Sequence, residues 1–556
     1  ALIFSFALPT TAHAGHAQLH YRFGIPLTIV FFIEFLSQKK WRSFVISFGW
    51  LCWQFYAGIY MGFFTLLLLA TMTLTFLVFE LMKTHGALKE IVKNFIFSWR
   101  SQTQQQQTIY IILCVVLILL MVLLFFPYLQ VSRLYGVKRP WQEISSMLPR
   151  PQSYFLSDSS FLWSKLVSGF FTGIPMRHEH QMFIGLVPLL LAFFGIYVGV
   201  RIINRNVFIL MFGMLVTTIV LTLSIKGYSL WFFFHKFPLA SAIRAITRLD
   251  QAILFPIAFF CAITIDYFRL HLRMRSQLMI AAILVFLFLE FSMTSMPTSQ
   301  KNEWRQRISA AEQLLPNTLP ENTVFFMAQR KGPFFADELD AMWVALRHGM
   351  KTLNGYSGFL PPGYSSEYGT DCAELPRRIV AYLRFIPQNN NNNSNLYHEL
   401  MRKVTPLGFE NCDDAWLSKP PLTYANREYT AEEIKHLTYK IILQNGSVGK
   451  PNVIVKIINS GAVHFSALSE IDKPLRLSWR FLDSAGNPLT GWNTRKDLPL
   501  DILAYGELHV VLPVSQNGRS DCGVLQVSMV QERVFWAHDI GIPPATIPWG
   551  CKTQTN

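Results

Sequence analysis

Long apolar runs alternate with short basic stretches along the first half of the chain, and this alternation constrains the fold more than any other feature. The basic stretches are residues 38–42, 83–100, 201–205 and 269–275, and each falls on the same side of the alternating series. Lysine and arginine beside membrane helices usually stay on the cytoplasmic side. The pattern therefore predicts a polytopic α-helical membrane domain with a defined orientation.

The apolar runs contain few charges, and most are close to the ~20 residues that a helix needs to cross a hydrocarbon core. They predict about eight complete spans. Residues 1–14 are interpreted as the end of an upstream helix, a further partial span, because a signal peptide would need a basic start that is not visible here. The runs cover residues 24–36, 43–60, 62–81, 108–126, 182–200, 207–224, 249–268 and 276–296.

With the basic stretches inside, residues 127–181 and everything after residue 296 are predicted to lie outside the cytoplasm. We therefore expect a multi-pass protein of a bacterial inner membrane with an extracytoplasmic C-terminal region. The domain boundaries that follow are 1–296 for the membrane domain, 297–438 for a mixed α/β region and 439–556 for a β-sandwich.

The formal charge of +15 comes from the membrane half. Residues 1–296 hold 23 Lys and Arg against 9 Asp and Glu, and residues 297–556 hold 26 against 25. The excess favours lipid head groups and phosphates as partners and argues against nucleic acid.

The period of the sequence changes to two after residue 438, which is typical of strands. Short strands separated by turn signals over about a hundred residues are typical of an immunoglobulin-like β-sandwich. Four cysteines in this half, Cys372, Cys412, Cys522 and Cys551, allow three pairings, of which Cys372 with Cys412 and Cys522 with Cys551 is preferred. The predicted strands are 441–443, 453–458, 475–482, 507–513, 524–530 and 533–538.

The chain contains no phosphate-binding loop, zinc-spaced cysteine and histidine cluster or Gly-x-Ser-x-Gly elbow, which argues against an ATP-driven pump or a soluble-type hydrolase. Polar residues near the membrane are more informative, because an ionisable group there is costly and usually has a partner or a role. Three clusters stand out, and they contain His16, Gln18, His20 and Arg22; Arg177, His178, Glu179, His180 and Gln181; and Arg244, Arg248 and Asp250 after the aromatic segment 231–235.

Arg244 and Arg248 are four residues apart, so on a helix they would project from one face. Guanidinium groups suit bidentate capture of phosphate. The alternative is a salt bridge to Asp250 with the side chains extended to the interface.

Residues 177–181 can be interpreted as part of a functional site or, equally well, as the solvated flank of a helix. His178, Glu179 and His180 leave a divalent cation open as a cofactor, but a compact triple without spaced partners identifies no metal site.

Several stretches resemble the bacterial integral-membrane glycosyltransferases of the GT-C superfamily. They are 15–27 (GHAQLHYRFGIPL), 179–186 (EHQMFIGL), 237–239 with 243–248 (FPL and IRAITR) and 354–361 (NGYSGFLP). Residues 477–483 (LSWRFLD) and 534–536 (VFW) are similar to β-sandwich modules of bacterial surface-polysaccharide proteins, although generic core aromatics explain them nearly as well.

The resemblance implies transfer of a sugar from a polyprenyl-phosphate carrier to a glycan acceptor on the outer face of the membrane. Arg244 and Arg248 would neutralise the departing phosphate, and Glu179 and His180 would orient or deprotonate the acceptor hydroxyl. Trp231 would pack on the lipid or sugar, although a core position is its default. The family's acidic residue in the first outer loop is expected upstream of this chain. His16, Gln18 and Arg22 complete the expected substrate-binding set.

Two other functions remain open. A transporter of lipid-linked glycan would use the same basic mouth without a carboxylate base, although no internal repeat is visible. A non-catalytic scaffold for polysaccharide assembly would use the sandwich for docking and would tolerate replacement of Arg244 and Arg248.

Overall fold

Each of the eight apolar runs lies largely within a helix of the computed structural model. The structure describes residues 1–136, 139–237, 240–271, 273–296, 298–316, 323–328, 333–357, 375, 378–379, 382–383, 393–409, 423–445, 451–514 and 523–549. The eight helices are α3 (Gly24–Gln38), α4 (Trp41–Ala57), α5 (Ile59–Lys83), α7 (Gln104–Tyr135), α10 (Leu186–Ile202), α11 (Arg205–Thr222), α13 (Asp250–His271) and α14 (Arg273–Ser292).

Within the described residues, five helical segments are long and apolar enough to cross a membrane, whereas α10 and α14 are apolar but shorter. This indicates a membrane protein, and the count of eight spans stays a prediction. The five segments are Ala17–Gln38, Ile59–Lys83, Gln104–Tyr135, Arg205–Thr222 and Ile246–His271.

Helix α7 carries the clearest sign of a lipid environment. It begins at a capping box formed by Thr103 and Gln106 and ends at Gly136, whose left-handed backbone (φ 60°) suits glycine. None of its 32 residues is buried, although its sequence is strongly apolar. A helix of this kind is stable where lipid replaces water around it.

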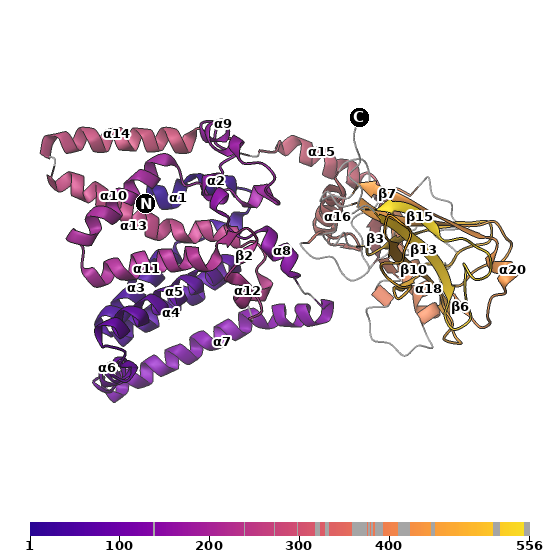
Figure 1. Cartoon of the computed structure of the whole chain (residues 1–556), viewed down its shortest axis with the longest axis horizontal. Coiled ribbons are helices and arrows are strands. Elements are labelled where there is room, and N and C mark those ends of the chain that lie inside the picture. Colours follow the sequence, from indigo (N-terminus) through magenta and orange to yellow (C-terminus); the bar gives the residue numbers. More distant parts are fainter. Residues whose placement is uncertain are drawn as a thin grey trace. The chain divides into compact units, whose positions relative to one another are not determined.

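Shorter elements lie at the two ends of the helical unit. Figure 1 shows the amphipathic helix α6 (Leu88–Arg100) at one end, and α8 (Trp141–Ser146), α12 (Trp231–Phe234) and the hairpin of β1 (Ser224–Ile225) and β2 (Tyr228–Ser229) at the other. The predicted partial span forms two short helices, α1 (Leu2–Phe6) and α2 (Leu8–Ala12), which meet at Ala7 in extended backbone. The other short segments are η1 (Ala17–Leu19), η2 (Pro151–Phe155), α9 (Trp163–Leu166), η3 (Ser168–Phe170), η4 (Arg177–Glu179), η5 (Ala240–Ala242) and η6 (Ile246–Leu249).

Helices α10 and α13 pack closely because a glycine lies between them. A Cβ atom at Gly195 would collide with the carbonyl oxygen of Phe260. Across the same contact, the Thr264 hydroxyl donates to the Leu191 carbonyl oxygen at 2.6 Å. Small residues and side-chain hydrogen bonds of this kind hold helices together in membranes, where apolar burial between helices contributes little.

Residues 299–556 form a second compact unit, separate from 1–298, so the first boundary lies two residues from the predicted one. It begins with α15 (Lys301–Glu312), followed by a parallel sheet of order β4-β3-β5. The remaining elements here are β3 (Val324–Met327), α16 (Phe334–His348), β4 (Lys351–Thr352), α18 (Asn393–Lys403), β5 (Val404–Leu407), β6 (Tyr424–Ala425) and α20 (Ala431–Ile434).

Five of the six predicted strands after residue 438 are present, and they form two antiparallel sheets. The predicted strand 533–538 is mostly turn, and only Phe535–Trp536 (β14) lies in a strand. Residues that alternate along β8, β10, β12 and β13 are buried in one shared core, as in a sandwich. The core also includes residues of the preceding region, and β6 pairs with β9, so the structure draws no compact boundary at residue 438. The strands are β7 (Leu437–Asn445), β8 (Pro451–Asn459), β9 (Leu468–Ser469), β10 (Leu475–Leu482), β11 (Lys496–Asp497), β12 (Glu507–Leu512), β13 (Gly523–Gln531), β14 (Phe535–Trp536) and β15 (Ala545–Trp549).

The sheet order is β12-β8-β7 in one layer and β11-β10-β13-β14 in the other, with β15 also paired to β13. The immunoglobulin-like assignment stays a prediction. The four C-terminal cysteines, and with them the predicted disulfides, lie outside the described residues.

Candidate functional site

A buried ion pair joins two of the predicted site residues, Glu179 and Arg248. The guanidinium of Arg248 donates to both carboxylate oxygens of Glu179, at 2.6 Å and 2.8 Å. The side chains are only 6% and 4% exposed. Such a bidentate contact fixes both side chains, and removing either partner would leave a buried charge.

Three more ionisable side chains complete what we call the ionic cluster, namely His13, His16, Glu179, Arg248 and Asp250. Arg248 donates to the Nε2 atom of His16 at 3.0 Å. His13 lies 3.4 Å from the Asp250 carboxylate, and its ring packs edge-on against that of His16. The ring of Tyr60 lies beneath the guanidinium, 5.2 Å from its carbon. The cluster thus draws residues from three separate parts of the sequence, and Tyr60 adds a fourth that contacts it.

Local structure places these side chains at one end of the helical unit. Glu179 ends η4, shortly before α10 begins, and Arg248 lies in η6, directly before α13. Tyr60 is at the start of α5, and His13 follows α2. Each basic stretch lies at the opposite end of its helices, so the ionic cluster is on the side that the charge pattern predicts to be external.

Several buried polar atoms around the cluster have no hydrogen-bond partner among the described residues. The hydroxyls of Thr247 and Tyr154 have none, and Nε2 of His13 and the carboxylate of Asp250 pair only with each other, at 3.4 Å. Buried polar groups are almost always hydrogen-bonded, so a group of unmatched donors and acceptors needs a particular explanation.

The pKa of Glu179 shows which influence dominates in the cluster. Burial alone would raise it, but the hydrogen bonds and charge of Arg248 outweigh burial and hold the pKa below its ordinary value. Burial and the nearby Arg248 both lower the pKa of His16. Glu179 is therefore ionised and His16 neutral near pH 7.

His180 has a different environment from the one predicted for it. Its Nε2 atom lies 2.8 Å from the Ser146 carbonyl oxygen, and its Nδ1 atom lies 2.7 Å from the Ser153 hydroxyl. Because a carbonyl oxygen can only accept, Nε2 must carry the proton. Burial lowers the pKa of His180. Both ring nitrogens are occupied, so this residue connects loops instead of forming part of the ionic cluster.

Arg244 and Arg248 do not share a helix face, contrary to the expectation from their spacing. The chain is not helical from Ile243 to Ala245, and the helical turn begins only at Ile246. Arg244 is 36% exposed and lies 3.4 Å from Glu143 of α8. Asp250 is paired with His13 and not with either arginine. Arg244 is thus the more accessible cation, and Arg248 is the fixed one.

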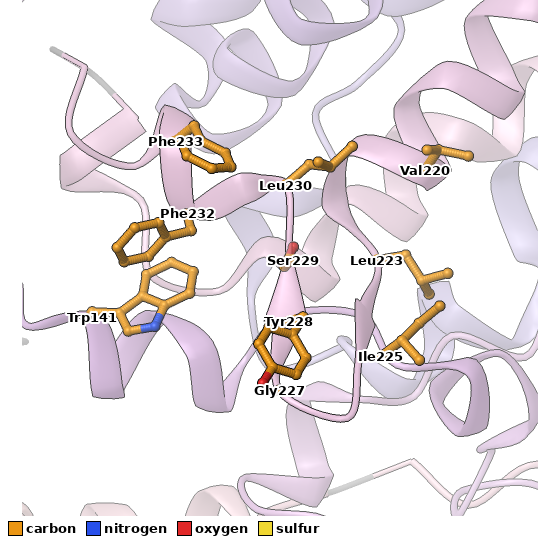
Figure 2. A pocket seen from close by; sticks show the side chains of 10 residues that line it. All are labelled: Trp141, Val220, Leu223, Ile225, Gly227, Tyr228, Ser229, Leu230, Phe232 and Phe233. Carbon is orange, nitrogen blue, oxygen red and sulfur yellow. The ribbon is translucent and has the colours of Figure 1, made fainter.

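An apolar pocket of about 740 Å³ opens at the same end, and Figure 2 shows its lining. Trp141 of α8 faces Phe232 of α12, with ring centres 5.1 Å apart, and Tyr228 projects from the β1–β2 hairpin. Helix α8 connects this pocket to the ionic cluster. Glu143 of this helix contacts Arg244. Met147, the first residue after the helix, accepts a hydrogen bond at its carbonyl oxygen from the amide of Thr247, at 3.1 Å.

Three other predicted site residues are not part of the ionic cluster, and two of them make structural contacts instead. Arg22 is buried and connects the first helices to α13, because it donates to the Phe4 carbonyl, the Thr10 hydroxyl and the Gln251 side chain. Trp231 is 1% exposed and packs on Phe63, so it takes the core position that was its default interpretation. Gln18 is exposed.

The part of the chain that the structure describes contains no group of three or more histidine, cysteine or acidic side chains arranged to hold a metal ion. His178 is 69% exposed and reaches Glu179 only at 4.0 Å, while His180 forms the loop contacts described above. These side chains do not supply a site for the divalent cation that was left open.

Glu290 is a buried carboxylate that sequence reasoning missed, and it has a structural explanation. Its oxygens accept from the amides of Leu186 and Val187, at 2.6 Å and 3.2 Å, and from the indole of Trp163 at 2.9 Å. It therefore caps the start of α10. Its hydrogen bonds distinguish it from Asp250, whose oxygens have none.

Sequence reasoning singled out Glu179, Arg248 and His16, which the structure brings together, but missed His13 and Tyr60. His13 could have been found only by its position, because it is an ionisable residue directly after the apolar residues at the start of the chain. No family model, curated protein or solved structure matches the chain.

Proposed function

We propose that this protein is a membrane glycosyltransferase that moves a sugar from a polyprenyl-phosphate carrier to an acceptor at the end of the helices where the ionic cluster lies. The observation that carries the proposal is the buried Asp250 carboxylate, which pairs with His13 at 3.4 Å, accepts no hydrogen bond from any other described residue and lies near the Glu179–Arg248 pair. A buried carboxylate next to a histidine suits the removal of a proton from an acceptor hydroxyl.

The carrier requires an apolar surface and a cation for its phosphate. The pocket lined by Trp141, Phe232 and Tyr228 offers the first, and Arg244, held weakly by Glu143, offers the second. In this proposal Arg248 keeps Glu179 ionised and in place, and Arg244 takes the role of phosphate ligand that we expected both arginines to share.

The decisive experiment measures transfer from a panel of radiolabelled polyprenyl-phosphate sugars in membranes that contain the protein. Asp250→Asn is compared with Asp266→Asn, which makes the same change on the same helix, where Asp266 is 57% exposed and paired with Arg269. We expect Asp250→Asn to lower the rate by about 10²–10⁴-fold and Asp266→Asn to leave it unchanged. Absence of transfer from every donor would refute the proposal, and equal rates in both variants would remove Asp250 from the mechanism.

We also propose that the protein lies in a bacterial inner membrane with the ionic cluster and residues 299–556 outside the cytoplasm. The charge pattern supports this orientation. A chain whose seven native cysteines are replaced can carry a single cysteine at Ser241 or at Ser101, both exposed and at opposite ends of the helices. An impermeant maleimide applied to intact cells freed of the outer membrane should label the first and spare the second, and the reverse result would invert the orientation.

A further inference from the structure

A second apolar cavity lies at the end of the helical unit opposite the ionic cluster. It has a volume of about 760 Å³, is open on one side and is lined by residues of α3, α4, α5 and α6. Its lining includes Phe32, Phe76 and Phe95, and the one hydroxyl-bearing side chain among its lining residues is that of Thr73. A volume of this size is within the range of ~300–1,000 Å³ typical of ligand pockets.

Helix α6 forms one wall of the cavity and is firmly attached there. Phe95 packs against Phe35, with ring centres 5.4 Å apart, and Trp99 packs against Trp41 at 4.8 Å. The Ser98 hydroxyl donates to the Lys39 carbonyl oxygen at 2.7 Å. The position of the wall is therefore fixed by three contacts and does not depend on a bound molecule.

The apolar face of α6 is nevertheless incompletely covered. Leu88 is 52%, Val92 48% and Ile96 46% exposed, although all three also line the cavity. A helix with one apolar face and one charged face, placed at the end of a set of membrane helices, lies in the plane of the membrane surface. The cavity thus opens to the depth at which lipid chains begin.

Exposed cations lie on two of the helices that line the cavity. Lys89, Lys93 and Arg100 on α6 and Arg42 on α4 are exposed, and within the described residues none of them forms an ion pair. Lys89 and Lys93 directly follow the cavity residues Leu88 and Val92. An apolar cavity on a helix that also carries exposed cations is complementary to a molecule with an apolar chain and a negative head.

We propose that this cavity binds an anionic phospholipid, with an acyl chain among the aromatic side chains and the phosphate beside Lys89 and Lys93. The site is separate from the proposed sugar-transfer site and does not depend on it. A bound lipid would connect α6 to α3, α4 and α5 and so hold the basic end of the helices at a membrane surface that carries negative charge.

The test uses the purified full-length chain in detergent and competes phosphatidylglycerol against phosphatidylcholine with identical acyl chains, measured as retained lipid by native mass spectrometry. Each lost cation near a membrane surface weakens binding of an anionic lipid about fivefold, so the Lys89→Gln and Lys93→Gln double variant should bind phosphatidylglycerol about 25-fold more weakly. Binding of phosphatidylcholine should not change.

Two further variants separate the cavity from general electrostatics. Arg201→Gln with Arg205→Gln removes two exposed cations from the same end of the helices but outside the cavity, and it should leave the preference intact. Thr73→Phe fills the cavity and should reduce retention of both lipids. Equal retention of the two lipids by the wild type, an equal effect of the two charge variants, or no effect of Thr73→Phe would each overturn the proposal.

Discussion

The Glu179–Arg248 pair of the helical unit and the Glu338–Arg378 pair of the C-terminal unit are versions of the same contact in different surroundings. Both are bidentate, and in both the side chains are nearly inaccessible. Around Glu338 and Arg378, the Gly355 amide and the Leu353 carbonyl complete the hydrogen bonding, and Phe326 stacks on the guanidinium.

Around Glu179 and Arg248, by contrast, the hydroxyls of Thr247 and Tyr154 have no partner among the described residues, and Asp250 and His13 pair only with each other, at 3.4 Å. The comparison teaches that a buried ion pair by itself does not identify a site. In the proposed function, the unmatched polar groups beside the first pair belong to a ligand site, whereas the protein itself completes the hydrogen bonds of the second pair.

The largest effect is expected from breaking the complete pair. Arg378→Met leaves the Glu338 carboxylate buried without its cation and should destabilise the protein by about 3–5 kcal/mol. Thermal unfolding of the C-terminal unit within the full chain measures this. Arg347→Met removes a half-exposed partner of Glu312 in the same unit and should cost less than about 1 kcal/mol. Similar losses in both variants would contradict the assignment of a tightly coupled buried pair.

Replacing both members of each pair should separate stability from function. Glu179→Leu with Arg248→Met removes both charges, so the fold should survive, while sugar transfer should fall by about 10²–10³-fold. Glu338→Leu with Arg378→Met should leave transfer within about twofold, because that pair lies in the C-terminal unit and Gly355 and Leu353 complete its hydrogen bonds. Transfer rates per folded molecule decide the matter, and unchanged transfer in the first variant would make both pairs structural.

Arg244 should show a smaller effect, because it is half-exposed and only loosely held by Glu143. Loss of one charge-assisted contact to phosphate, worth about 1.5–3 kcal/mol, should raise KM for the carrier about 10-fold or more in Arg244→Gln and leave kcat largely unchanged. Lys226→Gln, an exposed cation on the turn of the β1–β2 hairpin, is the control. Equal KM values in the two variants would exclude Arg244 as the phosphate ligand.

The smallest effect concerns His180 and pH. Because burial lowers its pKa in the folded state, the unfolded chain takes up the proton first as the pH falls. The stability that it contributes is complete above about pH 6.5, the ordinary pKa of histidine, and is lost as the pH falls below that value. The melting temperature of the wild type should therefore decline between pH 7 and pH 5 more than that of His180→Asn. Parallel curves would show that the pKa of His180 is not lowered.

The sequence was sufficient to predict the helices, because long apolar runs have few alternative structures. It also predicted the strands after residue 438 from their period of two. It did not predict that the helix is interrupted between Arg244 and Arg248. The prediction assumed helical spacing for this segment, but the backbone of Ala245 is not helical.

The partners within the ionic cluster were harder to predict. Glu179 and Arg248 are 69 residues apart, and no local pattern connects them. Asp250 was considered only as a partner of the arginines, because sequence alone does not reveal that His13 lies nearer. Trp231 lies in the core, which was its default interpretation. The sequence could not decide this, because an aromatic run in a core looks the same as one in a binding surface.

Gly195 gives the protein a position from which the proposed sugar-transfer site can be changed at a distance. Glu179 lies before α10 and Arg248 before α13, so the separation of these two helices determines how the pair meets. A single methyl group at Gly195 would force the helix backbones apart, and the pair would shift although neither of its members had been altered. Random mutagenesis that selects for altered acceptor preference should therefore recover changes along the α10–α13 contact as well as in the pocket.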